Sequence, residues 1–115
     1  MSTIKVEPYI ADEDYDNPAM VTDFYEFTMA NCLFEHGFKD KVMVFDMFFR
    51  QNPDNQGYSI ACGQHALVKF LREYHFTDRD IMYLRTKGMS EDFLTYLKNY
   101  KWKGDMYALK EGLVC

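Results

Sequence analysis

The stretch that most restricts the fold of this sequence is the apolar run at residues 41–50, Lys-Val-Met-Val-Phe-Asp-Met-Phe-Phe-Arg. Its valine and phenylalanine content, bounded by turn residues, is typical of a β-strand. Because the run is nearly continuous, we expect both faces of the strand to be covered. Residues 102–109 also have strand character, and residues 58–62 are a candidate short strand.

Helical signals surround these segments. Apolar residues recur at helical spacing over residues 23–36, with Thr22 as the expected N-cap and Gly37 as the stop. Further helices are predicted at 63–74, at about 81–87 behind a cap at 77–80, and after Ser90. The expected fold class is therefore α+β, with helices packed on a small, mainly antiparallel sheet that contains 41–50 and 102–109.

Two regions divide the chain. Residues 1–20 carry prolines and an acidic run and are expected to form an extended N-terminal arm. Residues 21–115 are expected to form one α+β domain. Residues 101–115 would give a strand, a turn and the start of a second strand, which leaves unpaired backbone. We therefore expect an incomplete domain that continues in a longer chain or needs a partner.

Composition narrows the class of protein. The net charge is −5, and no basic stretch resembles a nucleic-acid footprint. No segment is apolar enough for a signal peptide or a membrane span. Three widely spaced cysteines match no metal spacing, so neither a structural disulfide nor a bound transition metal is expected. Cys32 and Cys62 are predicted to be small core residues of a cytoplasmic protein.

Four stretches in order carry a family resemblance. They are VTDFYEFTMA at 21–30, VFDMFFRQNP at 44–53, GYSIACG at 57–63, and the paired segments 81–88 and 93–104. Together they resemble nicotinate phosphoribosyltransferases from Thr22 to Gly112. The sequence departs from the family pattern at Lys110, where a proline commonly stands, and at 54–57, where glycine is usually more frequent.

The resemblance implies the N-terminal domain of a type II phosphoribosyltransferase, whose α/β barrel has no counterpart here. It implies condensation of nicotinate with phosphoribosyl pyrophosphate to nicotinate mononucleotide and pyrophosphate, coupled to ATP hydrolysis, in NAD biosynthesis. Mg²⁺ and ATP would serve the complete enzyme, which is expected to be a homodimer. This segment alone is expected to be inactive and to bind no cofactor, and no residue in it is assigned a catalytic role.

The resemblance also assigns substrate-binding residues. Tyr25 would stack on the pyridine ring across the dimer interface, although aromatics at helical spacing usually pack a core. Asp23 would orient the base, or simply favour the start of a helix. Thr28 would line the same pocket, or bond the preceding turn as a buried helix threonine. Arg50 would grip phosphate with its planar fork, or be a solvated charge.

Other readings remain open at this point. The chain also fits a nicotinamide or quinolinate phosphoribosyltransferase, although TDFYEFTM with FFRQNP favours the nicotinate branch. A non-catalytic module that pairs with a separate barrel polypeptide is the alternative from a different class. The three histidines have no ligand spacing and are not assigned to metal or catalysis.

Overall fold

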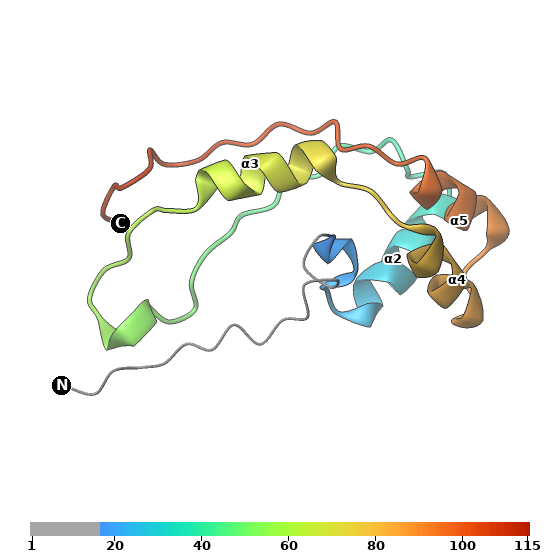
Figure 1. Cartoon of the computed structure of the whole chain (residues 1–115), viewed down its shortest axis with the longest axis horizontal. Helices are drawn as coiled ribbons and strands as arrows, with labels where there is room; N and C mark the ends of the chain where they lie inside the picture. Colours follow the sequence, from blue (N-terminus) through green and yellow to red (C-terminus); the bar gives the residue numbers. More distant parts are fainter. Residues whose placement is uncertain (1–16) are drawn as a thin grey trace.

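The computed structural model describes residues 17–115 (Figure 1). Most of the expected N-terminal arm, residues 1–16, lies outside the described residues. The end of that arm is not extended, because Pro18–Met20 form a short 3-10 helix, η1. The Asn17 side chain accepts a hydrogen bond from the backbone of Ala19, which satisfies one exposed donor of this turn.

Three α-helices and η1 pack into the core, which lies at the end of the molecule opposite the C-terminus (Figure 1). They are α2 (Phe24–Glu35), α4 (Asp78–Thr86) and α5 (Glu91–Lys98). Helix α5 contacts both of the others. The buried apolar residues are Ala19, Phe27, Phe76, Ile81, Leu84, Met89, Phe93, Leu94 and Leu97.

Local signals explain why these helices start and end where they do. Thr77 and Asp80 form a reciprocal capping box at the start of α4, as the sequence predicted. Ser90 caps α5 by accepting from the backbone N–H of Phe93. Gly88, with φ 84°, occupies the left-handed conformation that ends α4. The helix predicted at 23–36 is confirmed as α2, but its N-cap residue is Asp23 and not Thr22.

Helix α3 (Gln64–Glu73) lies apart from this core and runs beside the extended C-terminal segment (Figure 1). None of its residues is buried. The Glu111 carboxylate accepts hydrogen bonds from the backbone of Gly63 at 2.9 Å and of Gln64 at 3.3 Å. A carboxylate at a helix N-terminus satisfies free N–H groups and complements the helix dipole. Glu111 thereby ties residues 109–115 to the start of α3.

The predicted α+β fold with a mainly antiparallel sheet is wrong for the described residues. Residues 17–115 are helical and contain no strand or sheet, and their only regular pairing is one antiparallel bridge between Ile60 and Val114. Segment 41–50 is extended but unpaired, with Val44 89% and Phe45 85% exposed. Residues 102–109 are likewise unpaired. A strand exists only when a neighbouring strand supplies the other half of its backbone hydrogen bonds, and residues 17–115 supply no such backbone partner to either segment.

The chain is elongated as a result. Its radius of gyration is 17.4 Å, with extents of 53 × 32 × 23 Å. A compact domain of about 100 residues has a radius of gyration of about 13 Å. The short 3-10 helix η2 (Pro53–Asn55) lies near one end of the long axis, and the helical core lies at the other (Figure 1).

Candidate functional site

The start of α2 presents the first group of candidate residues. Asp23 is the N-cap residue in an extended conformation, and its side chain forms no capping hydrogen bond. Its carboxylate is exposed and available to another partner. Two residues later, the side chain of Tyr25 is 56% exposed and lies outside the core. The simple core-packing interpretation of Tyr25 therefore does not hold in residues 17–115.

Charged neighbours surround the Tyr25 hydroxyl. The pKa of Tyr25 is raised above its usual value, first by hydrogen bonding with the Glu26 side chain and then by the negative charges of Glu26 and Asp23. The positive charge of Arg50 acts in the opposite direction on the same pKa. Arg50 and Asp23 thus both lie close enough to Tyr25 for their charges to act on it. At neutral pH the phenol stays protonated and remains a donor.

Arg50 ends the extended segment 41–50 and precedes a loop that side-chain hydrogen bonds hold in place. Asn52 accepts a hydrogen bond of 2.8 Å from the Ser59 hydroxyl, and Ser59 is the one buried polar residue of the described chain. Gln51 and Asn55 also bond to each other at 2.8 Å. Within residues 17–115 the guanidinium of Arg50 forms no ion pair. Its planar fork is therefore free to bind an anion.

The Thr28 hydroxyl forms a hydrogen bond within its own helix. Its hydroxyl donates a hydrogen bond of 2.9 Å to the carbonyl oxygen of Tyr25, one turn earlier. This is the turn-bonding alternative considered from the sequence, although Thr28 is exposed and not buried. A contact between Thr28 and a ligand stays a prediction.

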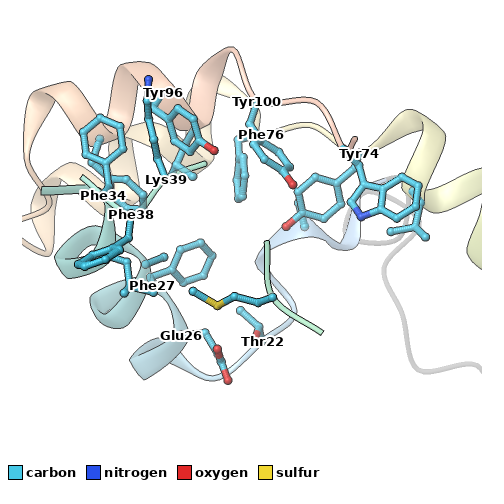
Figure 2. Close-up of a pocket in the computed structure, with 18 of the residues that line it drawn as sticks. Thr22, Glu26, Phe27, Phe34, Phe38, Lys39, Tyr74, Phe76, Tyr96 and Tyr100 are labelled. Carbon is cyan, nitrogen blue, oxygen red and sulfur yellow. The ribbon is translucent and has the colours of Figure 1, made fainter. Parts of the chain in front are cut away.

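A cavity of about 570 Å³ lies beside this group of residues and was not predicted from the sequence. Ten of its lining residues are aromatic, and Thr22 and Glu26 lie along one edge (Figure 2). Asp23, Tyr25, Thr28 and Arg50 do not line it. The aromatic share of the sequence, 17%, was the one available signal, and it gives no position.

The histidines and cysteines bond locally or lie at the surface. His36 Nδ1 lies 2.7 Å from the carbonyl oxygen of Cys32 and 3.7 Å from its Sγ. All three cysteines are free and exposed, so the prediction that Cys32 and Cys62 are core residues is wrong. Among residues 17–115, no three His, Cys, Asp or Glu side chains lie together as they would to hold a metal ion. No helix of this part of the chain has the length and apolar character to cross a membrane.

Comparison with known proteins identifies the family. Residues 20–115 match the family described as nicotinate phosphoribosyltransferase (NAPRTase) N-terminal domain. Nicotinate phosphoribosyltransferase pncB2 of Mycobacterium tuberculosis is 37% identical over 97 residues, which cover 84% of this chain and 21% of that protein. The Bacillus subtilis nicotinate phosphoribosyltransferase is 35% identical over 98 residues, covering 84% and 20%. Nicotinate phosphoribosyltransferase 1 of Arabidopsis thaliana is 35% identical over 98 residues, covering 83% and 18%.

This chain belongs to the nicotinate phosphoribosyltransferase family and corresponds to its N-terminal domain. It spans about a fifth of the length of the curated relatives that it matches. The match includes the start of α2, where Asp23 and Tyr25 lie, and segment 41–50, which Arg50 ends.

Proposed function

We propose that this chain forms the N-terminal domain of an enzyme that joins nicotinate to phosphoribosyl pyrophosphate, giving nicotinate mononucleotide and pyrophosphate. The reaction is coupled to ATP hydrolysis and belongs to NAD biosynthesis in the cytoplasm. The observation that carries this proposal is the family match over residues 20–115, which includes the exposed start of α2.

Tyr25 supplies a flat surface for the pyridine ring of nicotinate. An aromatic pair in offset or edge geometry contributes about 0.5–1.5 kcal/mol beyond the burial of area. The exposed position of Tyr25 supports this role, because a ring packed into the core would have no free face. In the proposed homodimer, Tyr25 of one subunit would reach the barrel of the other.

Arg50 and Asp23 act at the edges of the same site. The free guanidinium of Arg50 would bind phosphate oxygens in a bidentate manner, which a lysine cannot reproduce. Asp23 would orient the base or a basic group beside it. The sugar carbon passes through an oxocarbenium-like state in glycosyl transfer, so a base held at a fixed angle lowers the barrier.

Mg²⁺ and ATP belong to the proposal for the complete enzyme. Magnesium at such sites is bound mainly through substrate phosphates and one or two carboxylates. Residues 17–115 offer no carboxylate cluster that fits a metal ion, so no residue of this segment is assigned to it. The chain's own contribution is to bind and orient the base and a phosphate.

A chimeric enzyme tests the proposal. Residues 20–115 would replace the matching segment of the Bacillus subtilis relative, with that relative's own segment, joined at the same positions, as the control. We expect nicotinate mononucleotide formation that requires phosphoribosyl pyrophosphate. A chimera that uses nicotinamide or quinolinate in preference to nicotinate contradicts the assigned substrate. An inactive, folded chimera beside an active control contradicts the enzymatic role and favours a non-catalytic module.

Tyr25 is then tested within the active chimera. Tyr25→Ala should raise the KM for nicotinate by about 5- to 30-fold, the equivalent of about 1–2 kcal/mol of lost stacking and burial. Tyr25→Phe keeps the ring and should change KM little. Tyr83 is the matched control, because it is a helical tyrosine of similar exposure, 48% against 56%. An equal effect of Tyr83→Ala would assign the loss to general destabilisation.

A further inference from the structure

The backbone of Ser59 is held by a segment far away in the sequence. Its N–H donates a hydrogen bond of 2.8 Å to the carbonyl oxygen of Cys115, and the N–H of Cys115 donates one of 2.8 Å to the carbonyl oxygen of Ser59. These two bonds lie beside the antiparallel bridge between Ile60 and Val114. Both backbone polar groups of Ser59 are thus satisfied, and its hydroxyl is left for another partner.

The Ser59 hydroxyl binds the loop that follows Arg50. It donates a hydrogen bond of 2.8 Å to Oδ1 of Asn52, which lies two residues after Arg50. Ser59 is 6% exposed and is the one buried polar residue among residues 17–115. Water competes little with a hydrogen bond to a buried hydroxyl, so this bond restricts the position of Asn52 more than an exposed bond would.

The loop needs such a restraint because its backbone is strained. Asp54 and Asn55 have φ angles of 56° and 55°, in the left-handed region that residues other than glycine seldom adopt. Strained conformations persist only where the surrounding contacts determine them. Two side-chain bonds do so here, from Ser59 to Asn52 and from Gln51 to Asn55, each of 2.8 Å. Without them the loop would relax toward other conformations.

Arg50 lies directly before this loop, so the loop backbone determines where its side chain starts. Within residues 17–115 its guanidinium forms no ion pair that would fix it independently. Bidentate binding requires two parallel N–H groups to meet two phosphate oxygens, which only a narrow range of positions allows. A shift of about 1 Å in a binding group can greatly weaken catalysis, even when its cause is remote.

We propose that Ser59 and Asn52 are positioning residues that hold the strained loop, so that Arg50 presents its planar fork to a phosphate group of phosphoribosyl pyrophosphate or of ATP. Both act through Arg50 and not on the substrate. The inference rests on the phosphate contact proposed for Arg50. Loss of the bond between Ser59 and Asn52 should therefore weaken the same substrate that loss of the Arg50 fork weakens, and leave nicotinate unaffected.

Kinetics of the chimeric enzyme test this role, with KM measured separately for phosphoribosyl pyrophosphate, ATP and nicotinate. Ser59→Ala and Asn52→Ala should each raise the KM of the substrate that Arg50→Lys affects by about 3- to 10-fold, the range of one net hydrogen bond. The double variant should show no larger rise, because both substitutions remove the same bond. Thr95→Ala is the matched control, since the Thr95 hydroxyl forms a bond of 3.0 Å within α5, and should change no KM.

The kinetic outcomes separate this inference from the proposed function. A changed KM in Arg50→Lys beside unchanged values in Ser59→Ala and Asn52→Ala refutes the positioning role alone. An equal rise in the KM for nicotinate, or single effects that multiply in the double variant, also refutes it. No change in Arg50→Lys contradicts the phosphate contact of Arg50, and the inference fails with it.

A second measurement on this chain requires no activity. NMR relaxation should give amide order parameters of about 0.85 for residues 50–56, falling toward about 0.6 in Ser59→Ala and in Asn52→Ala. Asn52→Ala breaks the bond without altering a buried residue, so it serves if Ser59→Ala folds poorly. Thr95→Ala should leave these order parameters unchanged. A loop that is equally rigid in the parent chain and in Asn52→Ala overturns the inference.

Discussion

The packing of the chain predicts that replacing leucine with alanine lowers the free energy of unfolding strongly at one position and hardly at all at another. Leu84 of α4 is fully buried, at 0% exposure, whereas Leu109 in the unpaired C-terminal segment is 52% exposed. Truncating a buried leucine removes its transfer free energy and leaves a cavity, at a cost of about 2–5 kcal/mol. Truncating an exposed side chain usually changes stability by less than about 0.5 kcal/mol.

Urea unfolding followed by circular dichroism measures this difference. With an m-value of about 1–2 kcal/mol/M, a loss of about 3 kcal/mol in Leu84→Ala lowers the midpoint by about 2 M. A small domain has a free energy of unfolding of only about 5–15 kcal/mol, so Leu84→Ala should lose much of its helical signal at low urea. Leu109→Ala should unfold with the parent midpoint.

The comparison would refute the description of the fold if Leu109→Ala were as destabilising as Leu84→Ala. Residues 102–109 would then be packed in the chain, as a sheet requires. Phe45→Ala checks the other exposed segment, because Phe45 is 85% exposed and its loss should also leave the midpoint unchanged.

Three further predictions concern a cap, an ion pair and a ligand contact. Thr77→Ala removes the capping box and should cost about 1 kcal/mol in thermal unfolding, whereas Thr86→Ala, in the last turn of α4, should cost little. Arg85, bound to Glu91 at 2.6 Å, lowers the pKa of that carboxyl group. This stabilisation of the folded chain is present above the ordinary pKa of glutamate and is lost as the pH falls through the lowered pKa of Glu91. Arg85→Gln should therefore lower the Tm at neutral pH but not in acid. In the chimeric enzyme, Arg50→Lys should raise the KM for phosphoribosyl pyrophosphate or ATP with little change for nicotinate, because the charge remains and the fork is lost; a selective rise in the nicotinate KM would contradict this role.

The helices could be predicted because their signals are local. Thr77 with Asp80, Ser90, and Gly88 each fix a boundary through hydrogen bonds or dihedral angles within a few residues of their own position. The N-cap of α2 was misplaced by one residue, since Thr22 and Asp23 are both acceptable caps.

The sheet was wrongly predicted because strand pairing is not a local property. The run of valine and phenylalanine at 41–50 correctly indicates an extended, apolar segment, but no sequence window shows whether a partner lies beside it. The prediction of burial fails for the same reason: Cys32 lies at the surface although the apolar residues Leu33 and Phe34 follow it. When the partner of a strand or of a buried side chain lies far away in the sequence, only the three-dimensional structure shows it.

The sequence named the candidate binding residues one by one but gave no arrangement, and their roles in binding stay predictions. The resemblance singled out Asp23, Tyr25, Thr28 and Arg50. The fold brings the charges of Asp23 and Arg50 within reach of the Tyr25 hydroxyl, while the Thr28 hydroxyl bonds within its own helix. Glu26, which has the largest effect on the Tyr25 pKa, was not singled out by the sequence analysis. An acid in the first turn of a helix is common enough to be assigned to the helix dipole alone.

In the proposed homodimer, this chain would supply one half of a nicotinate site shared between two subunits. Subunits of the chimeric enzyme carrying Tyr25→Ala would be mixed with subunits inactivated in the barrel, and nicotinate mononucleotide formation at low nicotinate would be measured. If Tyr25 reaches across the interface, one site of each mixed dimer contains two intact halves, and the mixture should be more active than either preparation alone. Activity equal to the average of the two separate preparations, in a sample shown to exchange subunits, would contradict the account.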